Sequence, residues 1–375
     1  MQLNWLPDLQ IYRVVLKNAN MIIGGEHVVS PDILFRKSKG YLSGLIRDFK
    51  DDYIVNFTFG GYYSLLAIID AIKSAFDNDS VVLFPSYLCP SILKPFKSRE
   101  IKYKFYKIDE NLFVDTDYLI SIIDNNVKSV LFIDYFGASQ IDQLQPVLEI
   151  LKSKKIIIIQ DIVQCLQIRK DKLFGDYIFN SFRKFFPFEG SILLSKRKMD
   201  IDFRKGSNRY IKYKRIGQFL RYFHVKYNLG SSKHFLSFFR KAEDCYYKND
   251  ILRMPKFNFR QLNKYDIEFI ANKQKYYFNQ LFNVFSDKVP GLLHKNNFVP
   301  LGFVIKIDGR DSVREYLFKQ NIFSPIHWIL PVEIDAKVFS KSINLSSLIL
   351  TLPLIGLTEQ KFKYLFENIN KYLNK

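Results

Sequence analysis

The stretch Ile156-Ile157-Ile158-Ile159-Gln160-Asp161 decides the fold class that the sequence predicts. Four consecutive isoleucines without alternating polar residues are typical of a short strand that is buried on both faces, as in a parallel sheet. The stretch ends in a carboxylate, which places Asp161 at the carboxyl end of the expected strand. Ligands of open α/β sheets bind at that end of the strands. Asp161 is therefore the first candidate for a functional residue.

Similar apolar runs precede this strand, and each is followed by a stretch with helical spacing. The expected strands cover residues 53–58, 81–84 and 130–134, and the helices after them cover 62–76, 90–96 and 141–151. This β-α-β-α order predicts a mainly parallel sheet that helices cover on both faces.

The alternation of expected strands and helices ends after residue 196. Residues 196–228 are basic and aromatic, contain Gly206-Ser207-Asn208 and are followed by Gly230-Ser231-Ser232, which predicts a connector between domains. Helical spacing returns over 233–285, a strand is expected over 299–307, and a last helix over 359–373. We therefore expect an α/β chain with a large domain over residues 1–205, and connector helices followed by a smaller C-terminal α+β domain over 206–375.

The composition predicts a soluble protein with a packed core. Of the 375 residues 48% are hydrophobic, yet no apolar run reaches the roughly 18 residues of a membrane span. The first residues do not have the pattern of a secretory signal. Cys89, Cys165 and Cys245 are odd in number and lack the spacing of a zinc site. We therefore expect neither disulfides nor a metal, and a cytoplasmic location.

The chain carries a formal net charge of +19, from 56 Lys and Arg against 37 Asp and Glu. Such an excess attracts anionic partners, including nucleic acid and acidic lipid. The basic residues are spread along a chain that is rich in Lys, Asn, Ile, Phe and Tyr throughout, which favours a compositional bias over a nucleic-acid surface. The charge is also compatible with an anionic small substrate.

Lys184 is the second candidate residue, in the run Ser181-Phe182-Arg183-Lys184 after the apolar residues 177–179. The segment after Asp161 is long enough for one loop and one further strand, which would return Lys184 to the same sheet edge. A lysine that forms an imine and a carboxylate that faces a ring nitrogen are the two groups that a pyridoxal 5'-phosphate (PLP) enzyme needs. The like charge of Arg183 favours the neutral amine that imine formation requires. Together these residues predict a PLP site.

Several other residues support this prediction. Gly60-Gly61 follows a strand and precedes a helix, so free backbone N–H groups could bind a phosphate there, together with the Ser181 hydroxyl. Gln164 could donate to the phenolic oxygen of the ring, and Tyr87 could stack on the ring face. Taken singly, the glycines are compatible with a tight turn, Asp161 with a helix cap, Tyr87 with the core and any lysine with a solvated surface. The prediction depends on the joint pattern.

The motifs together resemble the fold-type I PLP enzymes of the DegT/DnrJ/EryC1/StrS group, which are the sugar aminotransferases of surface polysaccharide (O-antigen) and antibiotic pathways. The resemblance covers most of residues 50 to 370. It is carried by Gly60-Gly61, Pro85-Ser86-Tyr87-Leu88-Cys89-Pro90-Ser91, Asp134-Tyr135-Phe136-Gly137, Gln160-Asp161-Ile162-Val163-Gln164, Gly175-Asp176, Ser181-Phe182-Arg183-Lys184, Ala242-Glu243-Asp244, Arg253-Met254, His327-Trp328 and Leu352-Pro353-Leu354.

This resemblance implies the fold of the PLP-dependent transferases and an aminotransferase that moves an amino group, from glutamate, to a keto group on a nucleotide-linked sugar. It also implies a homodimer with active sites at the subunit interface. The residue roles that it implies are Lys184 as Schiff-base lysine and general base, Asp161 on the pyridine nitrogen, Gln164 near the phenolic oxygen, Ser181 and the Gly60-Gly61 amides at the phosphate, and His327 near the substrate.

Three departures from the usual pattern of the group concern the phosphate and the lysine. Phe59-Gly60-Gly61 stands where the group has Ser-Gly-Thr, Gln160 replaces a glutamate, and the lysine lies three rather than five residues after the serine. Two other functions therefore stay open. One is PLP chemistry without transamination, as in the sugar dehydratases of the group, which Lys184 disfavours because those enzymes replace the lysine by histidine. The other is a noncatalytic protein that binds nucleic acid or other anions.

Overall fold

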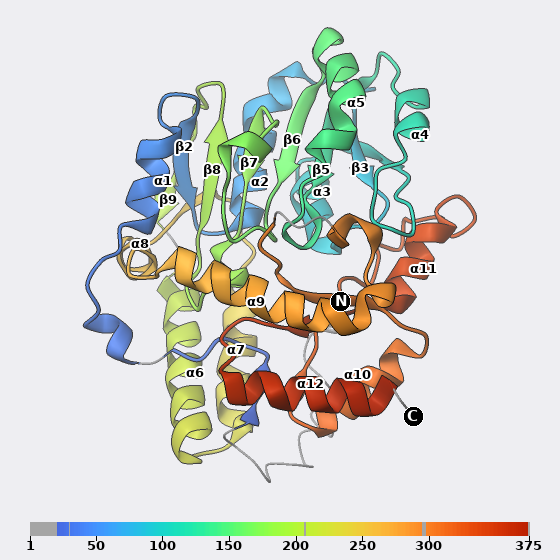
Figure 1. Cartoon of the computed structure of the whole chain (residues 1–375). Coiled ribbons are helices and arrows are strands. Elements are labelled where there is room, and N and C mark those ends of the chain that lie inside the picture. The colour runs from blue at the N-terminus through green and yellow to red at the C-terminus, as the bar shows by residue number, and fades with distance from the viewer. Residues whose placement is uncertain (1–20, 30, 206–207, 295–297, 374–375) are drawn as a thin grey trace.

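The computed structural model describes the chain except residues 1–20, 30, 206–207, 295–297 and 374–375. Its largest element is a nine-stranded sheet, drawn in the upper half of Figure 1. In spatial order the strands are β4 (Lys102–Tyr106), β3 (Val81–Pro85), β5 (Val127–Ile133), β6 (Ile157–Asp161), β7 (Tyr177–Phe179), β8 (Ser191–Ser195), β2 (Ile54–Thr58), β10 (Leu252–Arg253) and β9 (Arg204–Lys205).

The sheet is mainly parallel, as the strand pattern predicts. Strands β4, β3, β5, β6 and β7 run parallel to their neighbours, whereas β8 is antiparallel to both β7 and β2. The isoleucine-rich strand β6 lies in the middle, paired in register with β5 and β7, so that Ile133, Asp161 and Phe179 are neighbours. The carboxyl ends of three adjacent strands therefore meet at Asp161.

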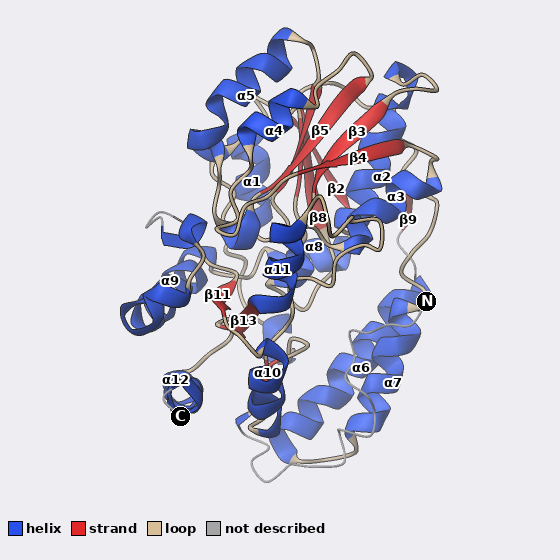
Figure 2. Cartoon of the chain, turned by 90° about the vertical axis from the view of Figure 1, so that its right-hand side faces the viewer, coloured by secondary structure: helices blue, strands red, loops and turns tan. Residues whose placement is uncertain are grey.

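Helices cover both faces of the sheet. Figure 2 shows α1 (Tyr41–Phe49), α4 (Thr116–Ser121) and α5 (Ile141–Ser153) on one side and α2 (Gly61–Ile72) and α3 (Leu93–Ser98) on the other. Helix α5 buries Leu144, Val147, Leu148 and Leu151, the i, i+3, i+4 and i+7 positions of one face. Helix α2 is apolar nearly all round, because it packs against β2, β7 and β8 as well as α3. The predicted two-sided cover is confirmed.

The smaller domain lies below the sheet in Figure 1. Its strands β11 (Gly302–Lys306) and β13 (Ile349–Pro353) are antiparallel, and β1 (Ile23–Gly24) pairs with β12 (Ile322–Phe323) in parallel. Its helices are α9 (Ile267–Phe285), α10 (Arg310–Lys319), α11 (Ser340–Leu348) and α12 (Glu359–Leu373). The predicted strand over 299–307 contains β11, and the predicted last helix coincides with α12. Strand β10 and helix α8 (Lys256–Leu262) return from this half of the chain to the large sheet.

The segment that the sequence predicts to contain connector helices forms a helical hairpin. Helix α6 (Asn208–Tyr227) and α7 (Ser232–Glu243) pack along each other and project away from the sheet (Figure 2). Dense basic and aromatic side chains hide the helical period of α6 in the sequence; Gly206-Ser207 lies outside the described residues. Phe235, Leu236 and Phe239 form a small core of their own in the hairpin. At Gly217 a Cβ atom would lie 2.7 Å from the Phe239 ring, so a glycine permits this close packing.

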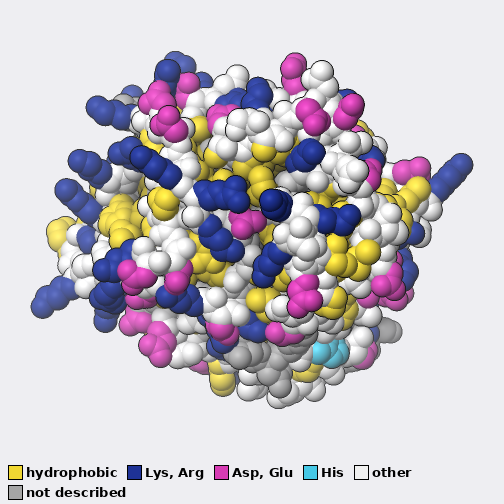
Figure 3. All heavy atoms as spheres, turned by 90° about the horizontal axis from the view of Figure 1, so that it is seen from above, with side chains coloured by type: hydrophobic (Ala, Val, Ile, Leu, Met, Phe, Trp, Pro, Cys, Tyr) yellow, Lys and Arg dark blue, Asp and Glu magenta, His cyan; other side chains and the backbone are white. Residues whose placement is uncertain are grey.

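On the face of the molecule above the sheet, basic and acidic side chains are mixed. Figure 3 shows the molecule from above the sheet, with Lys and Arg side chains distributed over the surface and Asp and Glu side chains among them. Among the described helices, none is long and apolar enough to cross a bilayer.

Candidate active site

Lys184 lies in the loop between β7 and β8. Strand β7 is only three residues long, and the chain then forms one 3₁₀ turn, Phe182–Lys184, before it returns along β8. The loop is fixed by buried Phe182, whose N–H donates to the Gly190 carbonyl at 2.9 Å, and by the Asn180 side chain, which accepts the Ile192 N–H at 2.8 Å. A half-buried lysine is thereby held at the carboxyl end of the sheet.

Asp161 lies at the end of β6, next to the strand that leads to this loop, and its side chain is 4% exposed. One carboxylate oxygen accepts the Val163 N–H at 2.8 Å. Burial raises the pKa of Asp161 to about 7, against the lowering effects of that hydrogen bond and of the Lys184 charge. The structure therefore brings the predicted carboxylate and the predicted amine within electrostatic reach of each other.

The Lys184 amine is biased toward its neutral form. Burial lowers its pKa, and the neighbouring Arg183 charge lowers it further, while Cys89, Asp161 and Glu243 act in the opposite direction. The sequence anticipated the Arg183 effect but not that burial is the larger cause. A neutral amine at the end of a parallel strand has the state that a nucleophilic lysine requires.

Gln164 carries an unsatisfied donor. Its carbonyl oxygen accepts the Phe136 N–H at 2.7 Å, which orients the side chain. Its Nε2 is buried and has no hydrogen-bond partner among the described residues. A buried amide donor without a partner costs free energy, so this group fits an acceptor oxygen of a ligand that the structure does not contain.

The Gly60-Gly61 pair begins helix α2, as predicted, but an aromatic side chain covers the turn. A Cβ atom at Gly60 would lie 2.2 Å from the Tyr246 hydroxyl, and one at Gly61 would lie 3.2 Å from the Asn180 carbonyl. The close approach thus joins the start of α2 to the lysine loop. Ser181 is on the same loop and is buried.

Arg183 brings a positive charge to this helix start. Its guanidinium stacks over the Tyr246 ring at 5.1 Å and forms an ion pair with Glu243 at 3.4 Å. Phe59-Gly60-Gly61 lacks the hydroxyl that Ser-Gly-Thr would offer to a phosphate at this helix start. An arginine beside the N-terminus of a helix supplies a different group that attracts an anion.

Tyr87 packs in an aromatic cluster of the core, one of the two positions that the sequence left open. It is fully buried, its ring contacts Tyr135 at 5.7 Å and Trp328 at 5.4 Å, and Tyr135 donates a hydrogen bond to its carbonyl at 2.6 Å. The same loop turns at Pro90 and carries half-buried Cys89, which lies close enough to Lys184 to act on the pKa of the lysine. The sequence analysis missed Cys89 because a single cysteine in a loop carries no pattern.

His327 comes from the smaller domain and lies close to the same lysine. It is buried, and its Nδ1 is 2.9 Å from the Thr351 hydroxyl. Burial, together with the charge of Lys184, lowers the pKa of His327 to about 3. The ring is therefore neutral at physiological pH and faces the lysine from the other domain.

A second buried carboxyl group lies beside Asp161. Asp134 follows β5, and burial, with a contribution from the Asp161 charge, raises its pKa to about 8. Gln160 Nε2 donates to Asp134 at 3.0 Å, while its Oε1 accepts the N–H groups of Phe174 and Gly175 at 3.0 and 3.3 Å. The amide of Gln160 can donate to Asp134 and accept from the backbone at the same time, which an ionised carboxylate at this position could not do. No periodic pattern in the sequence indicates this pair.

Residues from the N-terminal segment also reach the lysine loop. The His27 ring hydrogen-bonds the backbone of Lys184, and burial lowers the pKa of this histidine. Next to it, Glu26 forms an ion pair with Lys214 of α6 at 2.9 Å. Burial acts to raise the pKa of Glu26, but the Lys214 ammonium outweighs it and the pKa falls to about 2. The segment thus connects the lysine loop to the hairpin.

A cavity of about 230 Å³ opens near the carboxyl ends of β5 and β6. Both domains line it, through Asp134, Gly137, Ile162 and Cys165 of the large domain and Lys275, Phe298 and Val299 of the smaller one. It adjoins Asp161 along the strand ends but is not lined by Lys184.

Comparisons with known proteins identify the fold. No protein-family model matches the sequence, and no curated protein does. The solved structure of Helicobacter pylori PseC, an aminotransferase involved in pseudoaminic acid biosynthesis, is similar with a TM-score of 0.67 at 13% identity, over 94% of this chain and 99% of that one. A DegT DnrJ EryC1 StrS aminotransferase from Brucella abortus is similar with a TM-score of 0.63 at 15% identity, over 93% and 92% of the two chains.

The sugar aminotransferase Spr1654 of Streptococcus pneumoniae, in its PLP form, is similar with a TM-score of 0.64 at 14% identity, over 93% of this chain and 92% of that one. The chain therefore has the fold of PLP-dependent aminotransferases along nearly its whole length. The fold class predicted from the motifs is confirmed.

Proposed function

We propose that the chain is a PLP-dependent aminotransferase of the DegT/DnrJ/EryC1/StrS type that acts on a keto sugar. The observation that carries the proposal is the approach of Lys184 to Asp161 at adjoining strand ends, beside the unpaired donor of Gln164. A fold shared with aminotransferases supports it. Fold alone does not determine activity, so the proposal depends on these side chains.

The buried groups fit PLP in three places. Asp161 is a buried carboxylate that would gain a cationic partner in the protonated pyridine nitrogen, and Gln164 Nε2 would gain an acceptor in the phenolic oxygen. The phosphate would be held by Ser181, by the amides of Gly60-Gly61 and by the charge of Arg183. PLP, when bound, supplies an electron sink for a carbanion on the substrate.

Residues of the chain would then bind the cofactor, transfer the proton and exclude water. Lys184 would hold the aldehyde group of the cofactor and, once released by substrate, would accept and return a proton as general base, for which its lowered pKa suits it. Neutral His327, from the smaller domain, would face the substrate. Burial of the loop by Phe182 and Phe186 would exclude water from the lysine.

The finer parts of the proposal are a nucleotide-linked sugar substrate, glutamate as the amino donor, and a cytoplasmic homodimer in surface polysaccharide synthesis. The positive net charge suits a substrate with a diphosphate group. PseC, with which the chain shares its fold, is itself an aminotransferase of a sugar pathway. Light scattering in solution tests the dimer, and release of 2-oxoglutarate from glutamate in the presence of keto sugar nucleotides tests donor and substrate.

The position of the reactive lysine is tested by incubation with PLP, borohydride reduction and mass spectrometry of peptides. We expect a near-visible absorbance band and a pyridoxyl adduct on the peptide that contains Lys184, with both lost in Lys184→Ala. Lys198→Ala is the matched control, since it removes an exposed lysine beyond β8. An adduct on another lysine, or one that persists in Lys184→Ala, would contradict the proposal.

A noncatalytic anion-binding protein is the second candidate function. The observation that favours it is the Tyr246 hydroxyl over the start of α2, where the phosphate would bind. The same experiment separates the two, because a noncatalytic protein would remain colourless after PLP is added.

A further inference from the structure

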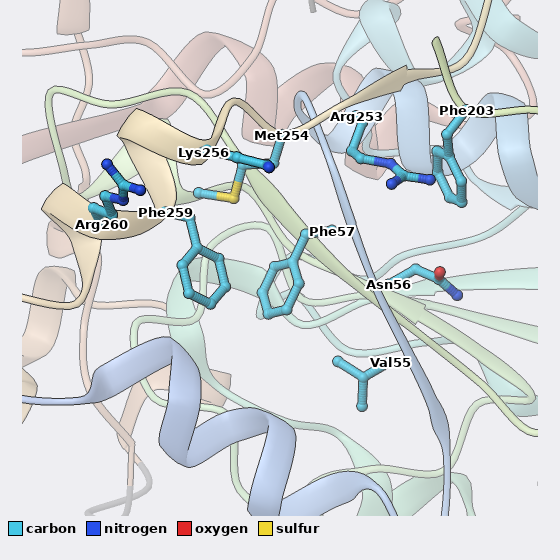
Figure 4. Close-up of a pocket in the computed structure, with 9 residues that line it drawn as sticks. All are labelled: Val55, Asn56, Phe57, Phe203, Arg253, Met254, Lys256, Phe259 and Arg260. Carbon is cyan, nitrogen blue, oxygen red and sulfur yellow. The ribbon is translucent and has the colours of Figure 1, made fainter. Parts of the chain in front are cut away.

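A separate cavity of about 440 Å³ lies where β2 and β10 meet helix α8 (Figure 4). It is open on one side and has a volume within the range of small-molecule sites. The residues that line it are Val55, Asn56 and Phe57 of β2, Phe203, Arg253 and Met254, and Lys256, Phe259 and Arg260 of α8. None of the residues assigned above to the PLP site is among them.

Three of these residues are cations, and none is neutralised. Arg253, Lys256 and Arg260 have exposed side chains, no acidic residue lines the cavity, and no ion pair to them occurs in the described part of the chain. Nearby Arg204 shows the contrast, since it has carboxylates of Asp202 and Asp250 at 3.8 and 3.6 Å. Three uncompensated charges around one hollow create a positive potential that favours an anion.

The floor of the hollow is aromatic. Phe57, Phe203 and Phe259 are only half-buried, and the rings of Phe57 and Phe259 meet edge to face at 5.3 Å. The Arg253 guanidinium lies over the Phe203 ring at 5.1 Å, as Figure 4 shows. Partly exposed rings gain free energy when an apolar or aromatic surface covers them. An inorganic anion would engage the cations and leave these rings in water.

We infer that this cavity binds a nucleoside phosphate, with the base against the phenylalanine rings and the phosphates against Arg253, Lys256 and Arg260. Guanidinium groups bind phosphate oxygens with two parallel hydrogen bonds and also stack on planar rings. Both features of the ligand are thus matched by adjacent groups of one hollow.

The cavity has a direct structural link to the lysine loop. Met254 lines the cavity and also packs against Gly190, which neighbours Phe182 of the lysine loop. A Cβ atom added at Gly190 would lie 2.6 Å from Met254 Cε and 3.2 Å from the Phe182 ring. The inference concerns a site of its own and does not require that Lys184 binds PLP.

Isothermal titration of the full chain with UDP tests the inference. We expect saturable binding that weakens by about tenfold or more in Arg253→Gln/Arg260→Gln, because charge-assisted hydrogen bonds are lost. Arg240→Gln, which removes an exposed arginine of α7, is the matched control and should bind UDP as the wild type does. Phe203→Leu should weaken UDP and leave pyrophosphate unchanged, since only UDP has a base to stack.

The outcomes distinguish this inference from the proposed function. UDP binding that the double variant leaves unchanged, or pyrophosphate binding as tight as that of UDP, would overturn the inference. Lys184→Ala should keep its UDP affinity here even if it no longer takes up PLP. If the glutamine variant unfolds, Arg253→Lys/Arg260→Lys replaces it: this variant keeps the charges but loses the paired guanidinium hydrogen bonds, so UDP affinity should fall, and an unchanged affinity would again overturn the inference.

Discussion

At the residue scale, the site is defined by acids and bases whose burial has changed their proton affinity. Asp161 and Asp134 are adjacent carboxyl groups with pKa values raised to about 7 and about 8, and Lys184 beside them has a lowered pKa. Each shift favours the neutral form of a group that has too few charged partners within the described structure. A cationic ring bound between Asp161 and Lys184 would remove this deficit for Asp161.

Asp161→Asn should weaken PLP binding by about tenfold to a hundredfold, because a charge-assisted hydrogen bond to the ring nitrogen would become a neutral one. Titration of PLP, followed by quenching of protein fluorescence, measures the change. Asp171→Asn, which removes an exposed carboxylate paired with Arg169, serves as control. Equal affinities for the wild type and Asp161→Asn would remove this residue from the cofactor site.

The stability of the protein without added PLP should fall as pH rises. Asp134 binds its proton more tightly in the folded protein than in the unfolded one, since its pKa is raised from 3.8 to about 8. Its contribution to the free energy of unfolding is therefore fully present below pH 3.8 and is lost as pH rises toward 8. For Asp134 alone the slope reaches about 1.4 kcal/mol per pH unit. The pKa of His327 is lowered from its ordinary value of 6.5, so this residue makes stability rise with pH, but only below pH 6.5.

Urea unfolding between pH 6.5 and 8 avoids most of the His327 titration, and comparison of the wild type with Asp134→Asn removes the opposing effect of Lys184, which both proteins share. Asp134→Asn should flatten the pH dependence of the unfolding free energy, whereas Asp117→Asn, an exposed carboxylate of α4, should not. An unchanged slope in Asp134→Asn would mean that Asp134 is ionised in the folded protein.

The sequence predicted the residue pair Asp161 and Lys184 because each is marked by a run of apolar residues before it. It did not predict the positions of Asp134 and Cys89, and it left open whether Tyr87 lies in the core. These depend on which way a loop turns after its strand, and a single sequence has no periodic signal for that direction.

At the element scale, the start of helix α2 is the tightest contact of the site. Tyr246 is itself packed among Phe59, Tyr63 and Tyr210, so its ring cannot move away easily. The sequence predicted a helix start here from two glycines, and it is confirmed. That an aromatic residue from beyond α7 covers the turn could not be predicted, because the contact spans nearly two hundred residues of chain.

Gly60→Ala should destabilise the protein by about 1–3 kcal/mol, because the added methyl group overlaps the Tyr246 hydroxyl. Tyr246→Phe removes that hydroxyl, so the double variant should recover part of the loss in thermal or urea unfolding. Gly44→Ala in α1 is the control: its Cβ atom meets only an Arg47 nitrogen at 3.9 Å, and a helix gains about 0.5–1 kcal/mol from this change. Additive effects of Gly60→Ala and Tyr246→Phe would contradict the contact.

At the scale of the whole molecule, the chain has one principal core and a smaller one in the α6–α7 hairpin. The sheet was predictable because β-branched runs alternate with helical spacing along the first 160 residues. The hairpin was not, since α6 has basic and aromatic residues on all sides and no apolar stripe. Its order comes from packing against α7, which propensity alone does not show.

Phe239→Ala should destabilise the hairpin without unfolding the sheet. We expect hydrogen exchange of the α6 and α7 amides to require about 3 kcal/mol less opening free energy, as is usual for a buried phenylalanine. Exchange of the β5 and β6 amides should stay unchanged. Phe132→Ala, in the sheet core, is the matched substitution and should lower protection throughout. A uniform loss of protection in Phe239→Ala would show that the hairpin and the sheet unfold together.

The pairing of β1 with β12 has a consequence for the order of events on the ribosome. Ile23 pairs with Ile322, so a residue near the start of the chain needs a partner that is synthesised about three hundred residues later. During synthesis the domains fold from the amino end onward, but this pair cannot form until translation has passed residue 323. The segment that contains β1 and, three residues later, His27 beside the lysine loop is thus held by its sheet partner only after the ribosome has passed residue 323.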